Sequence, residues 1–160
     1  MRRIAAVAAC AGVLSLVFAA LPAGATPRLT PPALFAGWDG EFVKASQGSY
    51  CWSASICADY VYPLEIKRRL AVVGRSPLAI RVGARARSVK LTLLQVHDGD
   101  TETVRALRAK PASPSRRRWL TRLPADLGSA SVLDVVVDYQ HDRGTSDFWV
   151  GLKTGENISP

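Results

Sequence analysis

Two short segments of this sequence place a histidine next to a carboxylate, the pairing from which a general base could be built. His97 is followed by Asp98 and His141 by Asp142, and serines are plentiful along the chain. A Ser/His/Asp hydrolase holds its nucleophile in a strained strand–turn–helix context, and no serine here lies in a Gly-x-Ser-x-Gly segment. The residues therefore do not predict hydrolysis, and we expect a protein that is not an enzyme.

Carboxylates also alternate along one turn-like segment, at Asp98, Asp100 and Glu102. Calcium binds loops that present oxygen ligands in this way. The segment lacks the terminal bidentate glutamate of the usual calcium loop, and Asp98-Gly99 is first of all a turn dipeptide. We expect a turn, with a calcium site at the three carboxylates as the alternative and no cofactor elsewhere.

The N-terminal segment has the pattern of a secretory signal peptide. Arg2 and Arg3 precede an uncharged apolar run over Ile4–Leu21, and Ala23-Gly24-Ala25 supplies the small residues that signal peptidase requires. We expect a signal peptide over 1–25, removed after Ala25, and a secreted protein of the extracellular space, periplasm or cell envelope. No integral membrane span would then remain. An uncleaved anchor is the alternative, since the run approaches the length of a membrane span.

A lipid anchor is a second alternative for this segment. Val7-Ala8-Ala9-Cys10 resembles a lipoprotein box, although few apolar residues precede it. We favour cleavage after Ala25, which removes Cys10 and leaves a Pro-rich arm over 26–34.

Cys51 and Cys57 are then the two cysteines of the mature chain. In an oxidising compartment a close pair of this kind predicts a disulfide. The spacing is neither that of a Cys-x-x-Cys redox motif nor, without a nearby histidine, that of a metal site. Tyr50 and Trp52 flank Cys51, so the closed loop could present a rigid aromatic anchor to a partner. The alternative, which we favour, is that Trp52 packs over the disulfide and closes the end of the core.

Charge is distributed unevenly along the chain. The segment 60–122 holds fifteen Lys or Arg and four acids, whereas 123–160 holds two Lys or Arg and six acids. Within the basic segment, Arg117 and Trp119 would share one face of a strand. If the fold separates the two charge types, we expect an anionic polymer of the envelope, or another protein, as the partner. Nucleic acid is not expected for an exported chain, and solvated strand faces are the simpler interpretation of the charges.

Apolar and polar residues alternate along most of the mature chain, as in strands with one buried face. The clearest stripe is Leu133, Val135, Val137 and Tyr139, and a break at Leu94 indicates a bulge or a strand buried on both faces. We expect strands near 41–46, 78–82, 89–96, 102–108, 119–123, 133–139 and 148–152. Their number and spacing predict an all-β fold, an immunoglobulin-like antiparallel β-sandwich of seven to eight strands, in one domain over 35–160.

The segment Gly48-Ser49-Tyr50-Cys51-Trp52, followed by Ile56-Cys57-Ala58-Asp59, resembles a group of uncharacterised secreted bacterial β-domain proteins. The resemblance implies a signal-led single β-domain with Cys51 paired to Cys57. It carries over no catalytic residue. Asp59 stands out by its place after Cys57, where it could cap the loop or contact a ligand. We therefore expect a binding or accessory module, with a purely structural secreted domain and a metal-binding enzyme as alternatives.

Overall fold

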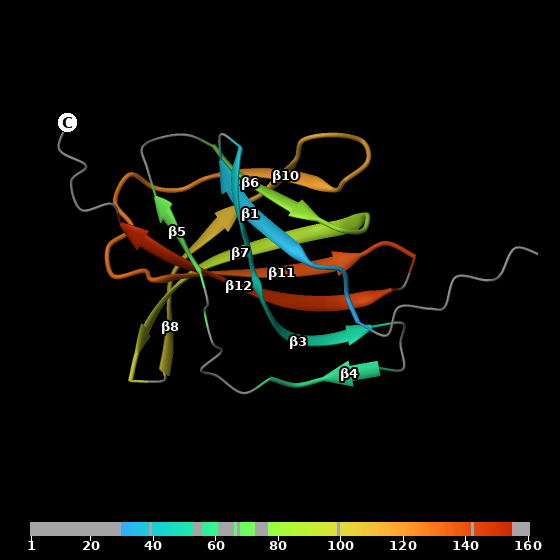
Figure 1. Cartoon of the computed structure of the whole chain (residues 1–160), viewed down its shortest axis with the longest axis horizontal. Coiled ribbons are helices and arrows are strands. Elements are labelled where there is room, and N and C mark those ends of the chain that lie inside the picture. Colours follow the sequence, from blue (N-terminus) through green and yellow to red (C-terminus); the bar gives the residue numbers. More distant parts are fainter. Residues whose placement is uncertain are drawn as a thin grey trace, which may run out of the picture.

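The computed structural model describes residues 30–38, 40–52, 56–60, 66, 68–72, 77–98, 100–141 and 143–154. The expected signal peptide over 1–25 lies outside these residues. The described residues form β-strands and no helix. No membrane-spanning helix is therefore found among them. The strands form two sheets, and most of them are labelled in Figure 1.

The smaller sheet, sheet A, has five strands in the order β2-β1-β6-β10-β9. All of its pairs are antiparallel. Its strands are β1 (Leu34–Trp38), β2 (Glu41–Lys44), β6 (Pro77–Val82), β9 (Lys110–Pro111) and β10 (Arg118–Arg122).

The larger sheet, sheet B, has seven strands in the order β4-β3-β12-β11-β7-β8, with β5 paired to β12. These strands are β3 (Ser46–Trp52), β4 (Ile56–Ala58), β5 (Arg69–Val72), β7 (Ala86–His97), β8 (Asp100–Arg108), β11 (Val132–Tyr139) and β12 (Gly144–Thr154). The last strand, β12, pairs with β11 along one edge. Its other edge is divided between β3, which is antiparallel, and β5, which is parallel.

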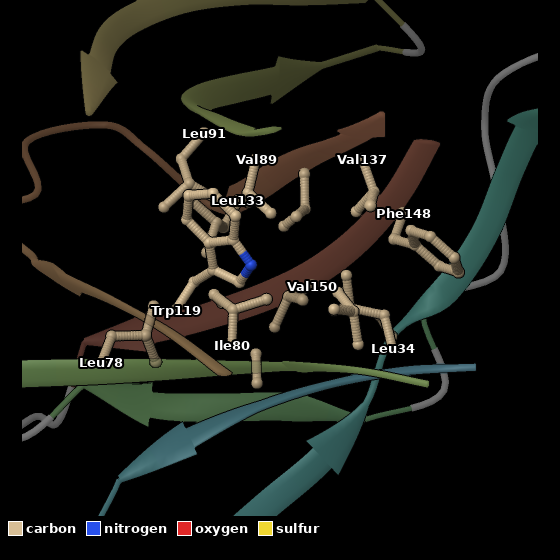
Figure 2. Close-up of a cluster of buried hydrophobic side chains, with 14 of the residues drawn as sticks. Leu34, Leu78, Ile80, Val89, Leu91, Trp119, Leu133, Val137, Phe148 and Val150 are labelled. Atoms are coloured by element: carbon tan, nitrogen blue, oxygen red, sulfur yellow. The ribbon is translucent and has the colours of Figure 1, made fainter. Parts of the chain in front are cut away.

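The core lies between the inner faces of the two sheets. The predicted stripe on β11 is confirmed, since Leu133, Val135, Val137 and Tyr139 are each 0% exposed. Opposite them, sheet A contributes buried residues of β1, β6 and β10, and the indole of Trp119 points toward Leu133 and Leu91 (Figure 2). Full burial of side chains of this size stabilises the fold by about 1.5–3 kcal/mol each.

The alternation also located the irregularity in β7 correctly. The register between β7 and β8 shifts at Leu93/Leu94, and both leucines are buried although they point to opposite faces. The turn expected around Asp98 joins these two strands, and β8 is the return strand expected at 102–108.

Other expectations need correction. The described residues form twelve strands rather than seven or eight, because β2, β4, β5 and β9 have only two to four residues and so show little or no alternation. Gln47-Gly48-Ser49, a sequence typical of a turn, lies inside β3 instead, where the register with β12 shifts opposite Asp147. The packed chain also begins inside the expected Pro-rich arm, since Pro31 and Pro32 are buried and β1 starts at Leu34.

Candidate functional site

The predicted disulfide is confirmed and joins two neighbouring strands. Cys51 on β3 and Cys57 on β4 are directly opposite each other in the register, with a Cα–Cα distance of 4.0 Å. Both cysteines are exposed, on the outer face of sheet B. The bond therefore ties the edge strand β4 to the sheet.

Trp52 lies on the other side of the sheet from the disulfide. Successive strand residues point to opposite faces, so Cys51 faces solvent and Trp52 faces the core, where it is 5% exposed. Its ring meets the ring of Tyr139 edge-on, with centroids 5.0 Å apart. Trp52 thus closes one end of the core, as favoured, but does not pack over the disulfide, and it cannot serve as a surface anchor.

The surface around the disulfide forms a shallow depression of about 430 Å³. Its wall is formed by Ser49, Tyr50, Cys51, Cys57, Asp59 and Thr145. Tyr50 is half-buried and lies 6.5 Å from the exposed ring of Tyr60, measured between centroids. The backbone N–H of Tyr60 donates to the hydroxyl of Ser49 at 3.1 Å. Tyr50 and Asp59, two predicted binding residues, are therefore brought together here.

Carboxylates gather beside this depression on the outer face of sheet B. Asp134 lies on β11 and Asp147 on β12, at diagonal positions of the register. Burial and then the charge of Asp147 raise the pKa of Asp134 to about 6, against a backbone hydrogen bond at Val135. Burial and then Asp59 raise the pKa of Asp147. This side of the molecule thus holds negative charge that is partly withdrawn from water.

The expected surface pair of Arg117 and Trp119 does not form. Trp119 is 4% exposed in the core, and its indole N–H donates to the carbonyl of Arg116 at 3.0 Å. Arg117 is exposed just before β10, where its carbonyl accepts a hydrogen bond from the N–H of Val82 at 2.9 Å. A buried tryptophan cannot contribute to a surface patch, so this prediction was wrong.

A different basic surface covers the outer face of sheet A. The register sets Lys44, Phe35, Arg81 and Arg118 side by side across β2, β1, β6 and β10. At the usual strand separation this row spans about 14 Å. Lys110 and Arg122 lie on the same face, one and two rows farther along. We call the five exposed cations the basic face: Lys44, Arg81, Lys110, Arg118 and Arg122.

No described carboxylate interrupts the basic face. The one acid in the strands of sheet A is Glu41, which pairs with the inward-facing Trp38 and so occupies the opposite parity. None of the five cations forms an ion pair with a described carboxylate. A single-sign surface of this kind attracts anions, and the attraction is screened by salt.

Aromatic rings lie among these cations. The guanidinium of Arg81 sits over the ring of Phe42, 3.7 Å from its centroid. Phe35, between Lys44 and Arg81, is 39% exposed. The sequence offered basic residues and phenylalanines separately, but only strand pairing brings together positions as distant as 35 and 118.

The alternative calcium site finds no support in the described residues. Among them, no group of three or more His, Cys, Asp or Glu could hold a metal ion. Asp98 lies in the turn between β7 and β8, where its carboxylate is 3.1 Å from Nε2 of His97, whereas Asp100 and Glu102 lie on β8.

Comparisons with known proteins found no relative. The sequence matches no protein-family model, no curated protein and no solved structure at a significant level.

Proposed function

We propose that this chain is an exported, non-enzymatic module of the cell envelope that binds an anionic partner through the basic face. The observation that carries the proposal is the row of Lys44, Arg81 and Arg118 with no carboxylate among them. Anionic polymers and acidic surfaces are recognised by charge of one sign held on a rigid frame. A five-stranded sheet that packs on a continuous core provides such a frame.

The outer face of sheet B does not carry charge of one sign. Asp134 and Asp147 lie there together with exposed Lys90, which stands in the same row of the register as Asp147. An anionic partner would therefore meet unbroken positive charge on sheet A and mixed charge on sheet B. The exposed disulfide supports placement outside the cytoplasm, where such bonds persist.

The segment 1–25 would act as a signal peptide cleaved after Ala25, with no membrane span afterwards. The sandwich would be immunoglobulin-like. The chain would be related to the secreted bacterial β-domain proteins that the segment from Gly48 to Asp59 resembles. The burial of Trp52 favours a structural role for the disulfide loop, so we assign partner binding to sheet A instead.

Charge substitution on the two faces tests the proposal. The triple variant Arg81→Gln, Arg118→Gln, Arg122→Gln removes three charges from the basic face. The matched control Lys90→Gln, Arg143→Gln, Lys153→Gln removes three exposed charges elsewhere. Binding to long-chain inorganic polyphosphate is titrated from about 50 to about 500 mM salt.

We expect wild-type affinity to fall steeply with salt, and the basic-face variant to bind at least about tenfold more weakly than the control. Equal losses in both triple variants would leave only net charge as the cause and would refute a specific face. Absence of binding both to polyphosphate and to anionic lipid vesicles at low salt would refute the proposed function itself.

A further inference from the structure

The basic face carries an exposed apolar ring at a position where a purely electrostatic site would have no use for one. Phe35 is 39% exposed and stands directly between Lys44 and Arg81 in the register. An apolar ring among cations contributes binding energy only when the partner removes it from water. A partner that uses both the cations and Phe35 must offer an apolar interior next to its negative charges.

We infer that the partner of the basic face is an anionic phospholipid bilayer, with the cations on the phosphates and Phe35 inserted between the lipids. Segments that bind at membrane surfaces combine Lys or Arg with Phe, Trp or Leu in this manner, although most are helical. Here the same combination lies on one face of a sheet. The inference rests on the proposed function, because it names the partner of the same face.

The surroundings of Phe35 fit an interfacial role. Phe42 lies one row away, and its half-buried ring carries the guanidinium of Arg81 at 3.7 Å. A guanidinium that lies over a ring can still donate its N–H groups to phosphate oxygens in pairs. Half-buried Leu120, in the same row as Phe42, extends the apolar strip toward Lys110.

Charge alone would give useful but modest affinity. Each Lys or Arg close to an anionic leaflet strengthens binding by about fivefold, so the five cations of the basic face together supply a gain on the order of a thousandfold. Transfer of the Phe35 ring from water into the interface adds roughly another tenfold. The contribution of the Phe35 ring to affinity therefore distinguishes a bilayer from a soluble polyanion, because a polyanion has no hydrocarbon in which to bury the ring.

The test compares two probes. One is a vesicle of phosphatidylcholine with about a third phosphatidylglycerol, a composition that gives a strongly negative surface. The other is soluble inorganic polyphosphate. Phe35→Ala is measured against both, with Val104→Ala as the matched control, because Val104 is 41% exposed on β8 of the other sheet. Thermal unfolding of each variant verifies that the fold is kept.

We expect Phe35→Ala to weaken vesicle binding about tenfold and to leave polyphosphate binding unchanged, while Val104→Ala changes neither. In Phe35→Trp, lipids brominated in the acyl chain should quench fluorescence beyond the level seen with the wild-type tryptophans. Equal vesicle affinity for Phe35→Ala and wild type, or polyphosphate binding without vesicle binding, would overturn the bilayer inference and leave the proposed function standing. Loss of both kinds of binding from the wild type would overturn the proposed function.

Discussion

The guanidinium carbon of Arg81 lies over the ring of Phe42, 3.7 Å from its centroid, and Phe42 belongs to the strand at the edge of sheet A. The contact connects β6 to β2 across the intervening β1, to which both strands are paired. A charged side chain with a fixed orientation loses less conformational entropy when it binds an anion. The ring thus prepares Arg81 for binding rather than only covering the sheet.

Removal of the ring should therefore weaken anion binding without removing any charge. We expect Phe42→Leu to lower polyphosphate affinity two- to fivefold, since an exposed cation–π contact is worth about 0.5–1 kcal/mol. Isothermal titration measures the effect. Phe42→Tyr, which keeps the aromatic face, is the control and should bind like the wild type; equal losses in both variants would contradict the role of stacking.

Trp52 should matter for stability and not for binding. Trp52→Ala leaves a cavity against Tyr139, and we expect it to lower the free energy of unfolding by about 3–5 kcal/mol. Urea denaturation measures this loss. Tyr60→Ala, at a ring that is 51% exposed, should cost less than about 1 kcal/mol. A folded Trp52→Ala protein with reduced polyphosphate affinity would argue against a purely structural role for Trp52.

The disulfide should be reducible without prior unfolding, because both cysteines are exposed. The Cys51→Ser, Cys57→Ser variant loses a short cross-link, and we expect a stability loss of about 2 kcal/mol with the fold retained. Urea unfolding with and without reductant measures it. Reductant should affect the wild type and leave the double serine variant unchanged; an unfolded variant would mean that β4 does more than extend the edge of the sheet.

Stability should depend on pH through Asp134. The folded-state pKa of about 6 exceeds the ordinary value of 3.8, so the folded protein holds a proton that the unfolded chain has released. The contribution of protonated Asp134 to the free energy of unfolding is complete below about pH 4 and is lost as the pH rises through about 6. Asp147 acts in the same direction, because its pKa is raised as well.

We therefore expect Asp134→Asn to stabilise the protein at pH 7 by about 1–2 kcal/mol, a figure reduced for the partial solvation of the site. The gain should be absent near pH 4. Urea unfolding across this range measures it, and a constant difference between variant and wild type at all pH values would contradict the assignment to Asp134.

Two glycines distinguish backbone strain from steric overlap. Gly144 and Gly128 have φ values of +100° and +57°. A methyl group at Gly144 would overlap the carbonyl oxygen of Cys51, whereas nothing lies within 4 Å of one at Gly128. We expect Gly128→Ala to cost about 1 kcal/mol and Gly144→Ala several times more. Thermal and urea unfolding rank the two variants, and equal losses would show that β3 moves to relieve the overlap.

The sequence predicted the buried residues correctly where the alternation within a single strand decides which side chains face the core. The period of two placed Leu133 to Tyr139 in the core, and the interruption at Leu94 located the shift in register. Alternation also holds around β10, where Trp119, Thr121 and Leu123 share a face and are all buried. The error lay in assigning Trp119 to the surface.

The basic face could not be predicted in this way, because it depends on pairing between strands. Phe35 and Arg118 are separated by most of the described chain, and only the register through Arg81 makes them neighbours. The short strands β2 and β9, which supply Lys44 and Lys110, have too few residues to show a period. Alternation gives the face of a residue, whereas its neighbours on that face come from topology.

The position of β12 has a consequence for how the chain folds. Because β3, β5 and β11 all pair with β12, the two parts of sheet B cannot join until the segment from Gly144 to Thr154 is available. Pairing residues near 50 with residues near 145 requires closure of a long loop, and such non-local contacts make folding slow. The pairs β3–β4 and β7–β8 can form early and locally, but β3 and β4 join the rest of sheet B only through β12. Completion of sheet B thus depends on β12, and a chain that crossed a membrane as an extended polypeptide could not complete this sheet until β12 had emerged.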